Sequence, residues 1–181
     1  MRTIIAMLLG GWLFGTVLVG AVTAENFFMV DRLLNSVESS RQFLNDAAEL
    51  PPGEARLMLR HLASELNRFY FQAWEWIELV LGGTLLVLAF RKLPSKKLMI
   101  GFSGMLGIVL IMSLYITPEM IEVGRQLDFV PRDPPPPGLG GFGFLHGIYS
   151  TLDLAKLIIG IWTAVVLARL PSEPREPSKP S

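Results

Sequence analysis

Residues 70–90 read YFQAWEWIELVLGGTLLVLAF, a stretch long and apolar enough to cross a bilayer as one helix. The hydrocarbon core of a bilayer is about 30 Å thick and an α-helix rises about 1.5 Å per residue, so about 20 apolar residues span it. Two acids, Glu75 and Glu78, nevertheless lie three residues apart inside the stretch. We therefore expect a spanning helix that carries two carboxylates on one face and needs polar partners for them.

Three further stretches on either side of this one meet the same length criterion. They are Ile4–Ala24, Leu98–Ile116 and Leu145–Ala168, and with Tyr70–Phe90 they predict an all-α fold, an integral membrane four-helix bundle. The first stretch follows Arg2 and ends in small residues, so a cleaved signal peptide is the alternative interpretation of it. Its length favours a permanent span.

The basic residues predict the orientation of the bundle. The turn RKLPSKK at 91–97 has four basic residues and no acid, whereas segment 25–69 has seven acids, five arginines and no lysine. Lysine and arginine concentrate on the cytoplasmic side of membrane proteins. We therefore expect a multi-pass protein of the bacterial inner (plasma) membrane with both termini in the cytoplasm.

The connections between the spans are expected to differ in character. Segment 25–69 is predicted to be a helical external connection, because apolar residues recur every three to four positions on both sides of the Pro-Pro-Gly break at 51–53. The third span should also continue as helix beyond Pro118. Segment 129–144, with its DPPPPGLGGFG run, is predicted to be a non-helical external connector. Residues 171–181 are predicted to be a disordered cytoplasmic tail.

Composition excludes several classes of function. The chain is 51% hydrophobic and 18% charged, and its 16 basic and 16 acidic residues cancel, so nothing points to nucleic acid. It has no cysteine, which excludes disulfides and thiolate metal sites. No catalytic, phosphate-binding or zinc motif occurs, so we expect no enzyme activity, cofactor or metal. The lipid bilayer is the expected partner.

The fourth span carries polar residues that match the acids of the second. An isolated lysine or aspartate at the centre of a membrane helix costs about 2.5 to 3.5 kcal/mol, and such groups normally face the bundle interior. Both helices run inward from the external side, and by residue count Asp153, Lys156 and Glu78 reach similar depths. The candidate intramembrane polar site consists of Glu75, Glu78, His146, Tyr149, Asp153 and Lys156.

Two interpretations of this site remain open. The charges either hold the second and fourth spans in register, or they form a site for protons, a metal cation or a small polar substrate. Three carboxylates share one ammonium, so full ionisation would leave a net charge of −2. We therefore expect a protonated acid, or a cation or water that shares the site.

The remaining candidates concern packing and the two histidines. The pairs Gly11 and Gly15, and Ser103 and Gly107, are four residues apart, a spacing that lets helices approach closely within one chain or between copies in a homo-oligomer. His61 is expected to be a solvated surface residue. His146 could bind haem iron, but ligation by two histidines would require a second chain.

The stretches LRHLASELNRFYFQAWEWIELVLG, TAENFFMVDRLL and LDFVPRDPPPP…FLHGIYSTLDLAKLIIGIW also carry a family resemblance. Together they resemble bacterial members of the transmembrane-protein-205-like family. That family is a four-span group whose bacterial proteins are classed as a domain of unknown function. The resemblance implies a four-helix integral membrane protein of undetermined activity. The layout is more distantly similar to copper-resistance membrane domains, but the several intramembrane histidine or methionine ligands expected of those are not matched.

Three functional hypotheses follow. The first is a non-enzymatic membrane scaffold or accessory subunit of a membrane complex, with Glu75, Glu78, Asp153 and Lys156 as its buried polar core. The second is a small proton-coupled or cation transporter that uses the same cluster. The third is a membrane enzyme or haem protein centred on His146.

Overall fold

The computed structural model describes residues 1–35, 41–131 and 134–171, and every regular element within them is helical. The helices are α1 (Arg2–Asn35), α2 (Arg41–Glu49), α3 (Glu54–Lys92), α4 (Lys96–Ile111), η1 (Met112–Ile116), α5 (Thr117–Gln126) and α6 (Leu139–Ala168). Within these residues, α1, α3, the continuous run Lys96–Gln126, and α6 are each long and apolar enough to cross a membrane. The expected all-α class and its four apolar helices are confirmed.

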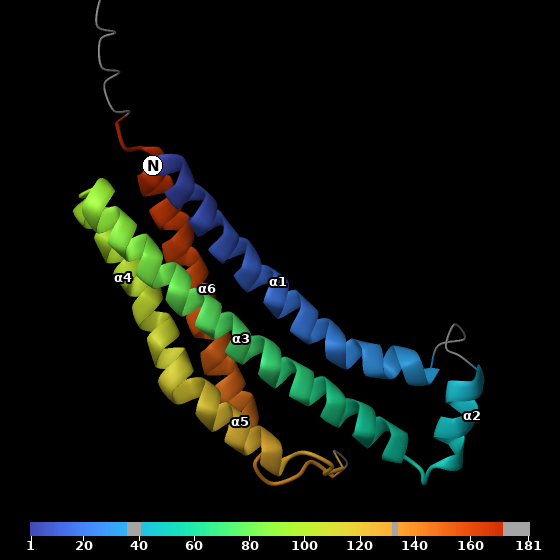
Figure 1. The fold of residues 1–181 in the computed structure, drawn as a ribbon. Helices are drawn as coiled ribbons and strands as arrows, with labels where there is room; N and C mark the ends of the chain where they lie inside the picture. The colour runs from blue at the N-terminus through green and yellow to red at the C-terminus, as the bar shows by residue number, and fades with distance from the viewer. Residues whose placement is uncertain (36–40, 132–133, 172–181) are drawn as a thin grey trace, which may run out of the picture.

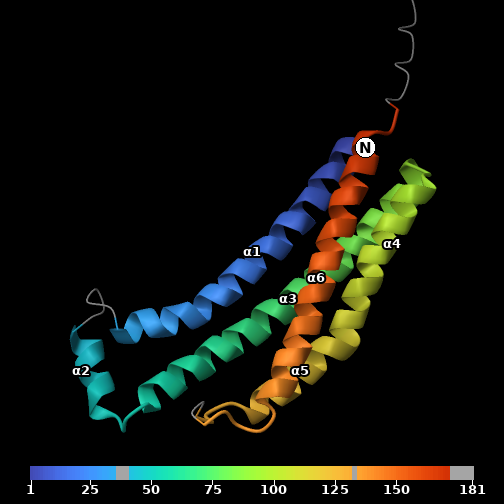
Figure 2. The same ribbon diagram turned by 180° about the vertical axis from the view of Figure 1, so that it is seen from behind.

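The four long helices enclose a common interior. α1 contacts α3 and α6, and α4 also contacts both, so the four form a closed ring (Figure 1). α3 crosses the bundle obliquely, and the halves of α1 and α3 that meet α2 diverge from α5 and α6 (Figure 2). The α1–α2–α3 end of the molecule therefore forms an arm that leans to one side of the bundle.

Two apolar clusters form the core. The larger lies toward the termini and includes Trp12, Leu85 and Phe102 from three helices. The smaller lies toward the α5 end and joins Met112, Met120 and Tyr149. Along α3 and α6 the charged residues come between the segments that supply the two clusters, so apolar layers cover the polar centre on both sides.

Close helix contacts explain the position of some small residues. A side chain at Gly15 would collide with the indole of Trp74, and one at Gly101 would collide with Thr163 of α6. In contrast, a side chain at Gly11 or Gly107 would meet no atom within 4 Å. The predicted close packing at small residues therefore holds for Gly15. The pair Ser103 and Gly107 lies outside the contact between α4 and α6, which Gly101 makes instead.

The segment between α4 and α5 is helical throughout, as the sequence predicted beyond Pro118. Its central turn, η1, is a π-helix immediately before Thr117 and Pro118. Proline has no N–H to donate to the preceding turn, and a local π-turn is one way to accommodate this. The helix therefore continues to Gln126 and brings Thr117 onto the buried face.

The connector before α6 is shorter than expected, and the non-helical prediction for 139–144 was wrong. α6 begins at Leu139, directly after Gly138, whose φ of 91° is favoured by glycine. The glycines that follow lower helix propensity by about 1 kcal/mol each, but tertiary packing against α5 overrides this preference. In segment 25–69, the other predicted connection, the described residues are mostly helical. Arg132, Asp133 and the predicted tail from residue 172 lie outside the described residues.

Candidate functional site

One carboxylate oxygen joins three helices at the centre of the bundle. Oε1 of Glu78 accepts hydrogen bonds from the indole Nε1 of Trp12 at 2.8 Å and from the Thr16 hydroxyl at 3.0 Å, both on α1. The Nζ of Lys156 on α6 donates to the same oxygen at 2.5 Å. All four side chains are buried. Glu78 is therefore the point at which α1, α3 and α6 are held together.

Lys156 is held by two carboxylates. Besides Glu78, its Nζ lies 2.7 Å from Oδ1 of Asp153, one turn earlier on the same helix. The Lys156 side chain is 1% exposed and that of Asp153 is 25% exposed. This confirms the predicted pairing of Lys156 with Glu78 and Asp153, and it places the aspartate at the edge of the cluster.

Glu75 has a different partner from the one expected. It is buried, and its Oε1 accepts a hydrogen bond from the hydroxyl of Thr117, the first residue of α5. Lys156 donates its hydrogen bond to Glu78 and forms an ion pair with Asp153. The three acids therefore divide into one ion-paired group and one acid bound by a hydroxyl.

The two aromatic members of the predicted site behave differently from each other. Tyr149 is buried, and its ring meets that of Phe71 edge-on at 5.1 Å between centroids. His146 is exposed, and its ring stacks on Phe142 at 6.3 Å within the same helix. His146, the outer end of the predicted polar stripe, therefore lies apart from the buried charges.

The charges of the cluster do not balance when all its acids are ionised. Glu75, Glu78 and Asp153 would carry −3 against the +1 of Lys156. Oε2 of Glu78 is buried and has no hydrogen-bond partner within the described residues. A buried polar oxygen without a partner is costly, so this atom is where a proton or a water molecule would be stabilised.

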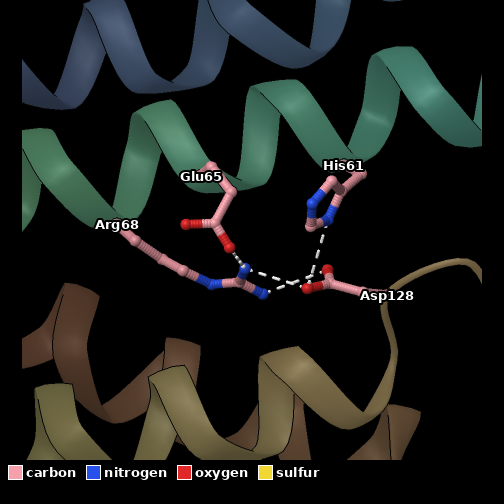
Figure 3. A network of polar contacts seen from close by, with 4 residues as sticks. All are labelled: His61, Glu65, Arg68 and Asp128. Atoms are coloured by element: carbon pink, nitrogen blue, oxygen red, sulfur yellow. Dashed lines mark hydrogen bonds and ion pairs between the residues drawn. The ribbon is translucent and has the colours of Figure 1, made fainter.

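A second polar network connects α3 with the end of α5 (Figure 3). Arg68 donates to both oxygens of Asp128, at 2.9 and 3.0 Å, and to Glu65 at 2.5 Å. Nδ1 of His61 lies 3.3 Å from Asp128, and the His61 ring packs against Phe129 at 4.5 Å. Burial lowers the pKa of Arg68, but the hydrogen bonds and charges of Asp128 and Glu65 outweigh burial and raise it above its ordinary value.

The sequence did not indicate this second network, in which His61, predicted to be a solvated surface residue, is 34% exposed and lies beside Asp128. His61, Glu65 and Asp128 have potential metal-ligating atoms within 4.8 Å of one another. However, the guanidinium of Arg68 already binds both carboxylates in the place where a metal ion would sit. The bidentate geometry is typical of a strong structural ion pair. The network therefore fastens the end of α5 to α3.

Two smaller sets of hydrogen bonds hold α1 in place. In the first, the amide of Asn67 donates to the carbonyl of Thr23 at 2.8 Å and accepts from Asn26 at 2.6 Å. In the second, the guanidinium of Arg2 donates to the carbonyls of Ala168 and Leu170 at the end of α6. The Arg2 contacts satisfy backbone carbonyls at the end of α6 that have no partner within the helix.

The chain has no counterpart in the comparisons with known proteins. No protein-family model matches it, and neither a curated protein nor a solved structure matches it.

Proposed function

We propose that the protein is a non-enzymatic scaffold or accessory subunit of the bacterial inner membrane. In this proposal the four long helices span the bilayer with both termini in the cytoplasm, and the arm of α1, α2 and α3 lies on the external side. The resemblance to the transmembrane-protein-205-like family belongs to the same proposal. The partners are lipid and, through the exposed faces, a second copy or another membrane protein.

The observation that carries the proposal is the convergence of three helices on Oε1 of Glu78. That oxygen accepts three hydrogen bonds, one from Lys156 on α6 and two from Trp12 and Thr16 on α1. α1 contributes no charged residue to the cluster. A carboxylate surrounded in this way is immobilised. Such an arrangement suits a residue that fixes helix register better than one that must exchange its partners during transport.

A neutralised pair tests the structural role. In the variant Glu78→Gln/Lys156→Met the glutamine amide oxygen can still accept from Trp12 and Thr16, and the remaining charge, on the partly exposed Asp153, can turn toward water. We expect the free energy of unfolding of this double variant to lie within about 1.5 kcal/mol of the native value, whereas Lys156→Met alone should be strongly destabilised. A direct exchange of the two residues is a weaker test, because a lysine side chain on α3 cannot accept those two hydrogen bonds. A double variant as unstable as the single one would contradict the proposal.

A second candidate function, a proton-coupled or cation transporter, is favoured by one observation. The cluster has more carboxylates than the ammonium can neutralise, and Asp153 at its edge is partly exposed. Ionisable groups inside membranes commonly form proton relays. An acid with surplus charge is a group on which a transported proton or cation could reside.

Purified protein in phosphatidylcholine vesicles separates the two functions. A potassium gradient with valinomycin sets the membrane potential inside-negative, and a trapped pH dye reports proton entry. A transporter acidifies the lumen faster than empty vesicles do, and the neutralised double variant, if folded, abolishes that excess. If acidification equals that of empty vesicles, the protein does not conduct protons and the scaffold function is supported. The same experiment with a cation-sensitive dye tests cation transport.

A further inference from the structure

α3 carries a single exposed apolar stripe along most of its length. With about 100° of rotation per residue, its members fall within about 140° of the helix circumference. Their exposed fractions range from 37% to 71%. The stripe consists of Met58, Leu62, Leu66, Phe69, Trp76, Ile77, Val80, Val87 and Phe90.

The stripe is longer than the hydrocarbon core of a membrane. From Met58 to Phe90 it extends over about 48 Å, against a core of about 30 Å. Arg91 and Lys92, directly after Phe90, fix its inner end at the cytoplasmic headgroups. At a tilt of about 40°, the upper end of the usual range, 48 Å projects to about 37 Å along the membrane normal.

That projection equals the hydrocarbon core plus one headgroup layer of about 7 Å. Phe69 and Leu66, about 24 and 28 Å from Phe90 along the membrane normal, would then lie in the outer hydrocarbon, and Leu62 and Met58, at about 32 and 37 Å, would lie among the external headgroups. The arrangement of the helices agrees with such a tilt, since α3 runs obliquely across the bundle and the arm leans to one side (Figures 1 and 2).

We infer that the outer end of this stripe, at Leu62 and Met58, is a lipid-binding surface that rests in the external headgroup layer and continues the lipid-facing side of the second span. The inference rests on the proposed membrane location. Continuity favours lipid over a protein partner, because the same stripe of the same helix already faces acyl chains at Val80 and Val87. Segment 25–69 has seven acids against five arginines, so the contact is apolar and does not require anionic lipid.

The absence of cysteine from the chain allows a direct test with single spin labels. Leu62→Cys places the label on the outer stripe, and Val80→Cys places it on the same stripe inside the span. The matched control is Asn45→Cys, on the exposed polar face of α2. The full chain is reconstituted in phosphatidylcholine vesicles with and without one third phosphatidylglycerol. Collision of each label with oxygen, which enriches in lipid, is compared with collision with a water-soluble nickel chelate.

We expect the labels at Leu62 and Val80 to favour oxygen and the label at Asn45 to favour nickel, equally in both lipid mixtures. A label at Leu62 that favours nickel, while Val80 favours oxygen, overturns the inference and leaves the membrane location intact. Spin–spin broadening at Leu62 that disappears on dilution with unlabelled protein assigns the surface to a second copy and also overturns it. A label at Val80 that favours nickel refutes the proposed span itself.

Discussion

Replacing Lys156 by methionine removes the only ammonium from the buried cluster and keeps a side chain of similar length. Glu78 then retains the hydrogen bonds from Trp12 and Thr16 but loses its counter-charge, and its Oε2 has no partner to compensate. Removing one partner of a buried ion pair typically costs about 3–5 kcal/mol. Asp153 adds little to this cost, because its partly exposed carboxylate can turn toward water.

Thermal unfolding in detergent micelles, followed by circular dichroism at 222 nm, measures the effect. For a chain of this size about 2–4 °C corresponds to 1 kcal/mol, so Lys156→Met should lower Tm by about 6–20 °C. The matched double variant Glu78→Gln/Lys156→Met should recover most of that loss. A Tm for Lys156→Met within about 2 °C of the native value would refute the reasoning, because it would mean that the charge left on Glu78 costs less than 1 kcal/mol.

Two further predictions concern helix packing and the network at the α5 end. Gly101→Ala places a methyl group against a side chain of α6 and should lower the free energy of unfolding by about 1–3 kcal/mol. The control Gly107→Ala meets no neighbour and should be neutral or slightly stabilising. The Tm values of the two variants check this prediction, and equal values would contradict it. Asp128→Asn breaks the bidentate ion pair with Arg68 and should lower the free energy of unfolding by about 1–2 kcal/mol. It should also speed hydrogen exchange of the backbone amides in 117–126. The control Arg56→Gln, at an exposed ion pair, should change the free energy of unfolding by less than about 0.5 kcal/mol. Exchange in 117–126 that is as slow in Asp128→Asn as in the native protein would contradict the assigned role of the network.

The sequence predicted the features that depend on one helix at a time. Apolar length located the four long helices, and periodicity extended α1 and α3 beyond the expected spans. The pairing of Lys156 with Glu78 was also predictable, because the direction of each helix and the rise per residue fix the depth of both groups. Proline and glycine content misled the prediction for 139–144, where contacts with α5 determine the conformation.

The partners contributed by other helices were not predictable. Residue spacing places Glu75 and Glu78 on one face of α3, but it does not say which neighbour each acid meets. Thr117 reaches Glu75 because the π-turn before Pro118 sets the rotation of α5, and Trp12 reaches Glu78 because α1 packs closely along α3 at Gly15. For the donors on α1, the only signal in the sequence was that Trp12 and Thr16 lie four residues apart in an apolar span.

The central claim is that the Lys156 ammonium and the Glu78 carboxylate are in direct contact within the lipid-embedded bundle. Solid-state NMR on the full chain in phosphatidylcholine bilayers can measure the distance between ¹⁵Nζ of lysine and ¹³Cδ of glutamate, with Lys156→Met identifying the signal. The 2.5 Å contact to Oε1 and a carbon–oxygen bond of about 1.2 Å predict a nitrogen–carbon distance of about 3.5 Å. A distance beyond about 6 Å, the outer limit of a close charge pair, would contradict the account.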